Sequence, residues 1–247
     1  LSYSLRPAMC PCLQKSMRVI GILGGMSSSS TNLYYQRLNE QARRRLGGLH
    51  SADCLIRSVD FAVIEQLQKQ GDWQKAGAIL AKAACGLEAG GAELLILATN
   101  TMHKVAKHIT DSTSLPFIHI ADATSDAILA AGFRSPGLMA TAYTMEQDFY
   151  ISKLVDQGLN PLIPEPVDRL ETHRIIFEEL CKGVVLNESR EAYEGIARRL
   201  VERGADCMIL GCTEVGMLLN SGNVPVPVFD TTLIHCDKAL DAALSPE

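Results

Sequence analysis

The sequence predicts an α/β fold of two pseudosymmetric lobes, each built on a parallel sheet, with an active site at their interface. Three observations lead to this prediction. An apolar run that ends in polar residues occurs twice, at 92–101 and at 205–214, and the two copies align without a gap. A second pair of short runs, at 21–25 and 137–141, repeats at nearly the same spacing. Strand-like and helix-like segments alternate along the chain, which is typical of parallel βαβ units.

The first lobe is expected to span residues 17–115. Apolar runs bounded by glycine or turn-forming residues are typical of short buried strands in a parallel sheet. Such runs occur at 19–23, 54–59 and 94–98. Helices are predicted where amphipathic stretches end at paired glycines, from about Asn32 to Leu46 and from about Trp73 to Glu88. Another helix is predicted to start at 103–108.

The second lobe is expected to span residues 116–228 and to repeat this plan. Strands are predicted at 117–120, at 137–141 and in the run that ends at Leu210. The tail from about residue 229 to residue 247 is expected to return to the first lobe. Residues 1–16 contain two prolines, no periodicity and no continuous apolar run of a secretory signal, so they are predicted to be a flexible leader.

The composition argues against several classes of protein. The 247 residues carry a formal net charge of −5, which argues against a surface for nucleic acid or an anionic membrane. No apolar run approaches the roughly 20 residues that span a bilayer. The eight cysteines include no Cys-x-x-Cys pair and no zinc-finger spacing. We therefore expect no metal site and a reducing, cytoplasmic location.

Polar clusters follow several of the predicted strands, at the edge where open parallel sheets bind ligands. They include Met26 and Ser27 after the first strand, and Thr141 after its repeat in the second lobe. The duplicated runs end in Thr99-Asn100-Thr101 and in Cys212-Thr213-Glu214. Small residues and helix N-termini at these positions favour the binding of an anion such as a carboxylate.

This arrangement suits the inversion of a carbon that bears hydrogen, which needs a base on one face and an acid on the other. Cys212 is the predicted base or acid, because a helix N-terminus and nearby amides can lower a thiol pKa toward neutrality. Thr99 would face it from the other lobe. A hydroxyl is a weak base without an activating neighbour, and the sequence places none beside Thr99.

The chain resembles the aspartate/glutamate racemase family over nearly all of residues 17–245. The resemblance rests on five motifs: Ile-Leu-Gly-Gly-Met (22–26), Thr-Asn-Thr-Met-His (99–103), Ala-Thr-Ala-Tyr-Thr-Met (140–145), Ile-Ile-Phe-Glu-Glu-Leu (175–180) and Leu-Gly-Cys-Thr-Glu (210–214). It implies two α/β lobes, a homodimer, no pyridoxal phosphate or other cofactor, and proton transfer by two cysteines. Cys212 matches the second of these cysteines. Thr99 stands where the first is expected.

The resemblance also implies roles for the other polar residues. Asn100, Thr101 and Thr213 match positions that hold the substrate α-carboxylate. Met26, Ser27 and Thr141 match further ligand contacts, and Lys182 matches a lysine for the distal carboxylate of an acidic amino acid. His103 is expected to be structural. Glu214 is interpreted as a turn residue, and Thr99 could also serve as a helix N-cap.

The resemblance thus predicts a racemase of aspartate or glutamate, with Cys212 and Thr99 on opposite faces of the substrate. Two alternatives stay open because Thr99 replaces a cysteine. One is a chemistry that uses a single cysteine on the same scaffold, as in a hydantoin racemase, a maleate isomerase or a decarboxylase. The other is a dicarboxylate-binding protein that has lost turnover.

Overall fold

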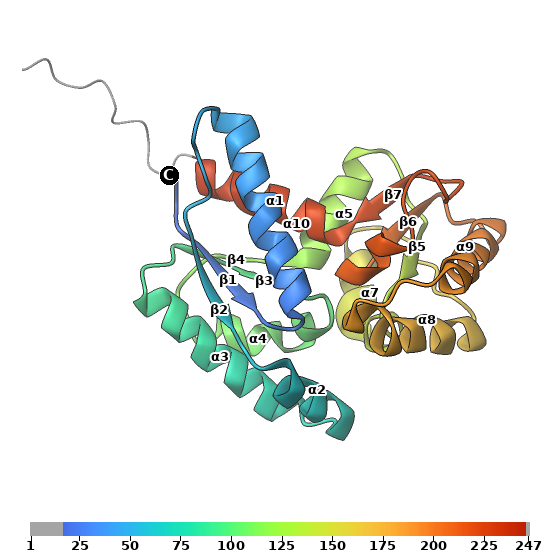
Figure 1. Cartoon of the computed structure of the whole chain (residues 1–247), viewed down its shortest axis with the longest axis horizontal. Coiled ribbons are helices and arrows are strands. Elements are labelled where there is room, and N and C mark those ends of the chain that lie inside the picture. Colours follow the sequence, from blue (N-terminus) through green and yellow to red (C-terminus); the bar gives the residue numbers. More distant parts are fainter. Residues whose placement is uncertain (1–16, 246–247) are drawn as a thin grey trace, which may run out of the picture.

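A computed structural model describes residues 17–245, so the leader predicted at residues 1–16 lies outside the described residues. The described chain forms two α/β lobes that lie side by side, the first mainly in blue and green with one red helix, and the second mainly in yellow-green to red (Figure 1). Each lobe contains its own sheet, and neighbouring strands within each sheet run parallel. The predicted fold class is confirmed.

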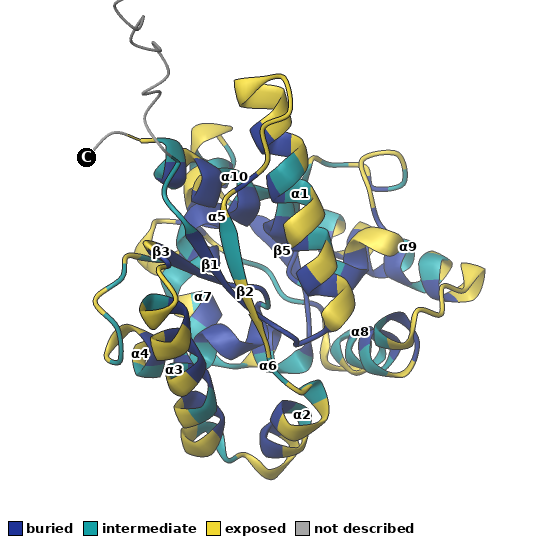
Figure 2. Ribbon diagram, turned by 60° about the vertical axis from the view of Figure 1, so that its left-hand side comes forward, coloured by how far each residue is buried: buried dark blue, intermediate teal, exposed yellow. Residues whose placement is uncertain are grey.

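The first lobe is built on a four-stranded sheet in the order β2-β1-β3-β4. The strands are β1 (Ile20–Gly24), β2 (Cys54–Ser58), β3 (Leu94–Leu97) and β4 (Phe117–Ile118). One face packs against α2 (Phe61–Gln70), α3 (Trp73–Ala89) and α4 (Ala106–Thr110). The other face packs against α1 (Ser28–Leu46) and α10 (Thr231–Leu244). In Figure 2 the buried β1 lies behind the more exposed edge strand β2.

The second lobe is built on a three-stranded sheet in the order β5-β6-β7. The strands are β5 (Pro136–Met139), β6 (Cys207–Leu210) and β7 (Val228–Asp230). One face packs against α8 (Pro166–Glu178) and α9 (Asn187–Glu202). The other packs against α5 (Ile120–Ala130), α6 (Ala142–Glu146) and α7 (Asp148–Asp156).

In the described part of the chain, three 3₁₀ helices follow strands or helices near the lobe interface: η1 (Thr101–Val105), η2 (Leu180–Lys182) and η3 (Thr213–Met217).

The lobes exchange one helix each. α5 follows β4 of the first sheet but buries Ile120 and Ile128 against the second sheet. α10 follows β7 of the second sheet but buries Cys236 and Leu240 against the first. The two exchanged helices also pack against each other. The strands β1, β3 and β4 therefore correspond to β5, β6 and β7, and β2 is an addition at the edge of the first sheet.

Strand pairing differs from the expected lobe limits by a few residues. The segment predicted as a strand at 117–120 ends at Ile118 and pairs with β3 in the first sheet, because the His119 side chain accepts from Ala121 N and caps α5. β7 pairs with β6 in the second sheet, so only the helix of the tail returns to the first lobe. α1 begins four residues earlier than expected, because Ser27 is its N-cap.

Within residues 17–245, none of the helices combines the length and the apolar character required to cross a bilayer.

Candidate active site

The predicted polar clusters meet between the lobes, at the carboxyl ends of β1, β3, β5 and β6. They enclose a cavity of about 30 Å³. A water molecule needs roughly 10–15 Å³, so the cavity holds a few waters at most. Its walls are Met26, Phe61, Gln68, Thr99, Asn100, Thr101, Thr141, Ile176, Phe177, Cys181, Gly211, Cys212, Thr213 and Glu214.

Gly25 fixes the turn that brings Met26 to this cavity. Its φ of +97° lies in the region that favours glycine, and a Cβ there would lie 2.2 Å from the Val59 carbonyl oxygen. The Gly25 N–H donates to Thr31 Oγ1 at 2.8 Å. The next residue but one, Ser27, then caps α1 by accepting from Ser30 N at 3.2 Å.

Three threonine hydroxyls join the lobes on one side of the site. Thr101 of η1 lies 3.0 Å from the Thr141 hydroxyl and 3.3 Å from that of Thr144, and the last two are 3.2 Å apart. Thr141 also caps α6, since its hydroxyl accepts from Thr144 N. All three residues are buried. The first turns of η1 and α6, one from each lobe, therefore face each other across this cluster.

Asn100 is oriented by a chain of hydrogen bonds to the second lobe. Thr231 donates its hydroxyl proton to the Leu210 carbonyl at 2.9 Å, so its oxygen accepts from Asn100 Nδ2 at 3.0 Å. The amide oxygen of Asn100 consequently points away from Thr231. It is buried and has no donor among the described residues.

Cys212 directs its thiol at a buried carboxylate. Its Sγ donates to Glu214 Oε2 at 2.9 Å, and Glu214 is 5% exposed. Burial raises the pKa of the Cys212 thiol well above its usual value, and the charge of Glu214 adds to this effect. Cys212 is therefore a protonated thiol in this structure. Glu214, interpreted from the sequence as a turn residue, is its hydrogen-bond acceptor.

The same carboxylate links the two lobes. Glu214 Oε1 accepts from Ser27 Oγ at 2.8 Å and from Ser30 Oγ at 3.1 Å, both at the start of α1 in the first lobe. Its Oε2 also accepts from the Thr213 hydroxyl. Four side chains thus donate to one buried carboxylate, which offsets the free energy that burying its charge costs.

Thr99 lines the cavity without an activating partner. Its hydroxyl makes no hydrogen bond with any residue in the described range, and it does not cap η1, whose N-cap is Asn100. The Thr99 carbonyl accepts from His103 Nδ1 at 2.8 Å, while His103 Nε2 accepts from Ile120 N at 3.2 Å. Both nitrogens of His103 are occupied by backbone groups, and burial lowers its pKa well below the usual value. His103 is a neutral structural residue.

Comparison with known proteins identifies the family. Residues 23–239 match the model of the Asp/Glu/hydantoin racemase family, which is most of the chain. The chain belongs to this family. Racemases are isomerases, so the resemblance carried by the five motifs is confirmed at the level of family and enzyme class, and the family supports a racemase function on acidic amino acids in general.

Relatives of known structure match over almost the whole chain. A Yersinia pestis protein described as a candidate Asp/Glu racemase is 46% identical and superposes with a TM-score of 0.87, covering 93% of this chain and 100% of its own. A Pyrococcus horikoshii aspartate racemase homologue is 36% identical with a TM-score of 0.81, covering 92% and 99%. The broad-specificity amino-acid racemase RacX of Bacillus subtilis is 21% identical over 87% of this chain and 93% of its own length.

Seven of the nine residues that the sequence singled out line the cavity: Met26, Thr99, Asn100, Thr101, Thr141, Cys212 and Thr213. Ser27 lies behind the wall, where it donates to Glu214. Lys182 does not reach the cavity. Helices that meet only in the folded chain add further wall residues, Phe61 and Gln68 from α2, Ile176 and Phe177 from α8, and Cys181 from η2.

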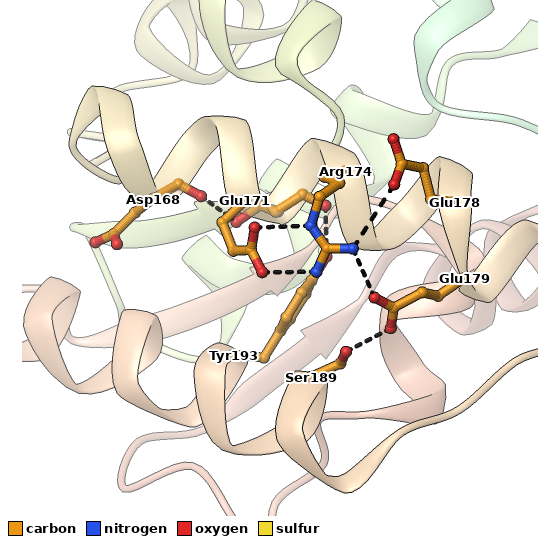
Figure 3. A network of polar contacts seen from close by, with 8 residues as sticks. Asp168, Glu171, Arg174, Glu178, Glu179, Ser189 and Tyr193 are labelled. Atoms are coloured by element: carbon orange, nitrogen blue, oxygen red, sulfur yellow. Dashed lines mark hydrogen bonds and ion pairs between the residues drawn. The ribbon is translucent and has the colours of Figure 1, made fainter.

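Lys182 instead lines a second, outer cavity of about 350 Å³ between α2 and α8. Gln68 and Phe177 line both cavities and so separate them. The outer cavity contains two other cations. Lys69 pairs with Glu65, and Figure 3 shows Arg174 enclosed by carboxylates.

Carboxylates surround Arg174, so Lys182 is the cation of the outer cavity that can bind an anionic ligand. Arg174 binds Glu171 through two nitrogens, at 2.7 and 2.9 Å, Glu179 at 2.8 Å and Glu178 at 3.8 Å. Its charge is thereby compensated. Lys182, in contrast, pairs with no carboxylate among residues 17–245. In that range no group of three or more His, Cys, Asp or Glu side chains could hold a metal ion.

Proposed function

We propose that this member of the Asp/Glu/hydantoin racemase family racemises aspartate or glutamate by direct proton transfer at Cα. The hydrogen bond from the Cys212 thiol to the Glu214 carboxylate carries the proposal. A thiol needs a nearby acceptor to become a thiolate base, and in this site the acceptor is 2.9 Å away. Thr99, on the other lobe, lines the same cavity.

The Cys212–Glu214 pair holds one proton and one negative charge. When that proton moves from sulfur to Oε2, Cys212 becomes a thiolate and Glu214 a neutral acid, and the net charge of the pair is unchanged. The thiolate can then take the Cα proton, with the electrons of the broken C–H bond passing into the α-carboxylate. Ser27, Ser30 and Thr213 donate hydrogen bonds to the Glu214 carboxylate. These bonds favour the form in which the proton is on Cys212, and the thiol can then return a proton to Cα.

Inversion requires a second proton on the opposite face of the carbanion. In the proposal Thr99 donates this proton and takes a replacement from water, while Glu214 releases the former thiol proton to the solvent, so that the site returns to its starting state. The Thr99 hydroxyl is free of other hydrogen bonds to described residues, so it can point to the substrate, but no base activates it. Thr99 is therefore the slower partner. Removal of Cα–H by Cys212 is expected to be faster than removal on the Thr99 side.

The remaining residues are proposed to hold the substrate. Thr101 and Thr213, which begin η1 and η3, are proposed to hold the α-carboxylate, because the first turn of a helix presents backbone N–H groups that favour an anion. Lys182 is proposed to attract the distal carboxylate from the outer cavity, since its charge has no carboxylate partner among the described residues. All proton transfers use side chains of this chain, so the proposal includes no cofactor. A homodimer and a cytoplasmic location stay predictions.

The closed cavity has to enlarge before an amino acid can enter. At about 30 Å³ it is too small for aspartate. Gln68 of the first lobe and Phe177 of the second separate it from the outer cavity. We propose that a small separation of the lobes at this point opens the path for the substrate.

Solvent exchange at Cα tests the proposed function. Each enantiomer of aspartate and glutamate is incubated with the protein in D₂O without pyridoxal phosphate, and deuteration at Cα and optical rotation are followed. We expect deuteration of at least one of the two amino acids and loss of optical rotation. The enantiomer deprotonated by Cys212 should exchange faster than it racemises, because reprotonation by Thr99 is slow.

Other outcomes would support the alternatives. Turnover of hydantoins or maleate without exchange of acidic amino acids would favour a single-cysteine chemistry on this scaffold. Binding of dicarboxylates without any turnover would favour a binding protein that has lost activity. Either result would refute the proposed racemase.

A further inference from the structure

A further cavity, here called the rear cavity, lies between the start of α1, the 3₁₀ helix η3 and the start of α10. Its volume is about 390 Å³, within the range of roughly 300–1,000 Å³ that is usual for sites of small ligands. Thr213 and Glu214 line both this cavity and the active-site cavity, and they lie between the two. The rear cavity is therefore a separate space that adjoins the active site.

Part of the rear cavity is apolar. Leu33 of α1, Met217 of η3 and Leu233 of α10 line it, one from each of the three elements. Leu33 and Leu233 are half-buried, and Met217 is 44% exposed. An apolar group that enters the cavity would remove these side chains from water, which favours its binding.

One carboxylate oxygen of the rear cavity has no partner. Asp230 caps α10 through Oδ1, which accepts from Thr232 N at 2.8 Å and from Leu233 N at 3.2 Å. Its Oδ2 has no hydrogen-bond donor among the described residues. This oxygen lies beside Gly216 of η3, where a Cβ would be only 3.2 Å away. The absence of a side chain at position 216 leaves the free oxygen uncrowded.

The charge of Asp230 is not compensated by an ion pair. Arg37 is the cation whose charge acts on Asp230, but in residues 17–245 its ion pair is with Asp237, at 3.0 Å. Burial raises the pKa of Asp230 above its usual value, although Arg37 and the two N–H groups at the start of α10 act in the opposite direction. A cation that reached Oδ2 would stabilise the carboxylate.

The chemistry of the walls determines which ligand fits. They contain two carboxylates, Asp230 and Glu214, and no lysine, arginine or histidine, so they attract cations and repel anions. Because Oδ1 of Asp230 already accepts two hydrogen bonds, one oxygen is left. A single oxygen suits the point charge of an ammonium better than the two-pronged contact of a guanidinium.

We infer that the rear cavity is a binding site for a primary ammonium ion with an apolar body. Asp230 Oδ2 accepts from the ammonium, and Leu33, Met217 and Leu233 pack against the apolar body. This site goes beyond the proposed function, since aspartate and glutamate carry a net negative charge and no apolar body. Its effect on the active site rests on the proposed function. A positive charge beside Glu214 favours the form in which the proton is on Cys212, so a bound ammonium should slow the removal of the Cα proton.

Three probes with a phenyl ring on a two-carbon chain test the site. They are 2-phenylethylammonium, 2-phenylethanol and 3-phenylpropanoate, with a positive, a neutral and a negative end group. Their binding is measured by calorimetry to the wild type, Asp230→Asn, Met217→Ala and Asp156→Asn. Asparagine keeps an N-cap for α10 and removes the charge. Asp156, at an exposed position of α7, serves as the control.

The wild type and Asp156→Asn should bind the ammonium about 10-fold or more tighter than the alcohol, as for a hydrogen bond between charged groups, and the propanoate most weakly. Asp230→Asn should raise Kd for the ammonium about 10-fold or more and leave that of the alcohol within about 2-fold. Met217→Ala should weaken both by the same factor, about 3-fold or more. A wild type that does not prefer the ammonium, or an unchanged Kd in Asp230→Asn, would overturn the inference.

Exchange in D₂O tests the link to the active site. At twice its wild-type Kd, 2-phenylethylammonium should lower Cα deuteration by the wild type to less than about half and leave Asp230→Asn nearly unaffected. Equal slowing of both would overturn the inference, because the ammonium would then act in the active-site cavity, which Asp230 does not line. An unchanged wild-type rate would overturn the link to Glu214. If the wild type exchanges no acidic amino acid at all, the proposed function is wrong, and calorimetry still decides whether the site exists.

Discussion

At the scale of single residues, the site is organised around one buried carboxylate. Glu214 accepts from the thiol of Cys212 in its own lobe and from Ser27 and Ser30 in the other. The same side chain therefore contacts both the Cys212 thiol and the start of α1 in the other lobe. Within its own lobe, Glu214 accepts from Cys212 and Thr213.

We expect Glu214→Gln to lower the rate of Cα deuteration by roughly 10²–10⁴-fold, the range for loss of a positioned acid or base. The amide oxygen can still accept from Cys212, but it cannot take the thiol proton. Glu202→Gln, at an exposed position of α9, is the matched control and should keep the wild-type rate. Equal rates for Glu214→Gln and the control would show that Glu214 only fixes the turn.

At the scale of secondary structure elements, three histidines lie close together near the starts of α5 and α10: His103 and His235 are buried, and His119 is partly buried. The His103 ring lies 4.5 Å from that of His119 and 5.9 Å from that of His235. His235 Nε2 donates to the Ile118 carbonyl, and its Nδ1 accepts from Tyr34, both at 2.8 Å. Burial lowers the pKa of His119 to about 3 and that of His235 to about 4.

These histidines predict acid sensitivity. In the unfolded chain they take up protons near pH 6.5, whereas in the folded chain they stay neutral to a much lower pH. The unfolded state thus binds more protons, and the free energy of unfolding should fall as pH decreases from about 6.5 toward 4. Above pH 7 this contribution is constant. Urea unfolding between pH 8 and pH 4.5 measures the effect.

Substitution of one histidine tests whether these histidines cause the acid sensitivity. His119→Asn keeps an acceptor for the N-cap of α5 and removes one titrating group, so the loss of stability with falling pH should be less steep. His50→Asn, at an exposed position, should leave the slope unchanged. The same slope in His119→Asn as in the wild type would refute this explanation.

The sequence was informative about elements that carry a strong local pattern. β1, β3 and β6 lie within the apolar runs bounded by glycines, and Cys212, Thr99 and Asn100 could be assigned to the site because they follow such strands. α8 is not among the helices that the local pattern predicts, and only the family motif at 175–180 overlaps it. Its pattern is irregular, since Val167 and Leu170 are 76% and 68% exposed.

Residues that depend on packing between distant elements gave no local signal. Gln68 and Phe177 meet at the cavity because α2 and α8 approach each other across the lobe interface, which no local sequence pattern indicates. The place of Lys182 in the outer cavity is equally a consequence of how η2 packs. The strand predicted at 117–120 ends at Ile118 in the structure. His119 alternates with apolar residues as in a strand, but its side chain caps α5 instead.

At the scale of the whole molecule, the exchanged helices make each lobe part of the core of the other. Without α10 the first sheet would expose Ile20, Ile22 and Ile96, which are fully buried. Without α5 the second sheet would expose Leu138 and Ile209. Neither lobe therefore has a complete core of its own, and we expect the described chain to unfold as one unit.

Two probes of unfolding test this expectation. Trp73, the only tryptophan in the sequence, lies in α3 of the first lobe, and its ring centroid is 5.6 Å from that of Tyr143 in α6 of the second lobe. Its fluorescence therefore follows the first lobe and its contact with the second, whereas far-ultraviolet circular dichroism follows both lobes. The two transitions should coincide in urea. Leu240→Ala in α10 should lower the free energy of unfolding by about 2–5 kcal/mol and shift both probes together.

Leu49→Ala provides the control, because Leu49 is fully exposed and its loss should change stability by no more than about 0.5 kcal/mol. Separate transitions for fluorescence and circular dichroism, in the wild type or in Leu240→Ala, would show that the lobes fold independently.

Cys212 is proposed to exchange a proton with Cα of an acidic amino acid. The most direct measurement is Cα deuteration of both enantiomers of aspartate and glutamate in D₂O by Cys212→Ala, beside Cys85→Ala as a control at an exposed cysteine. We predict that deuteration falls to the background rate in Cys212→Ala and stays at the wild-type rate in Cys85→Ala. Deuteration by Cys212→Ala as fast as by the wild type would contradict the proposed mechanism.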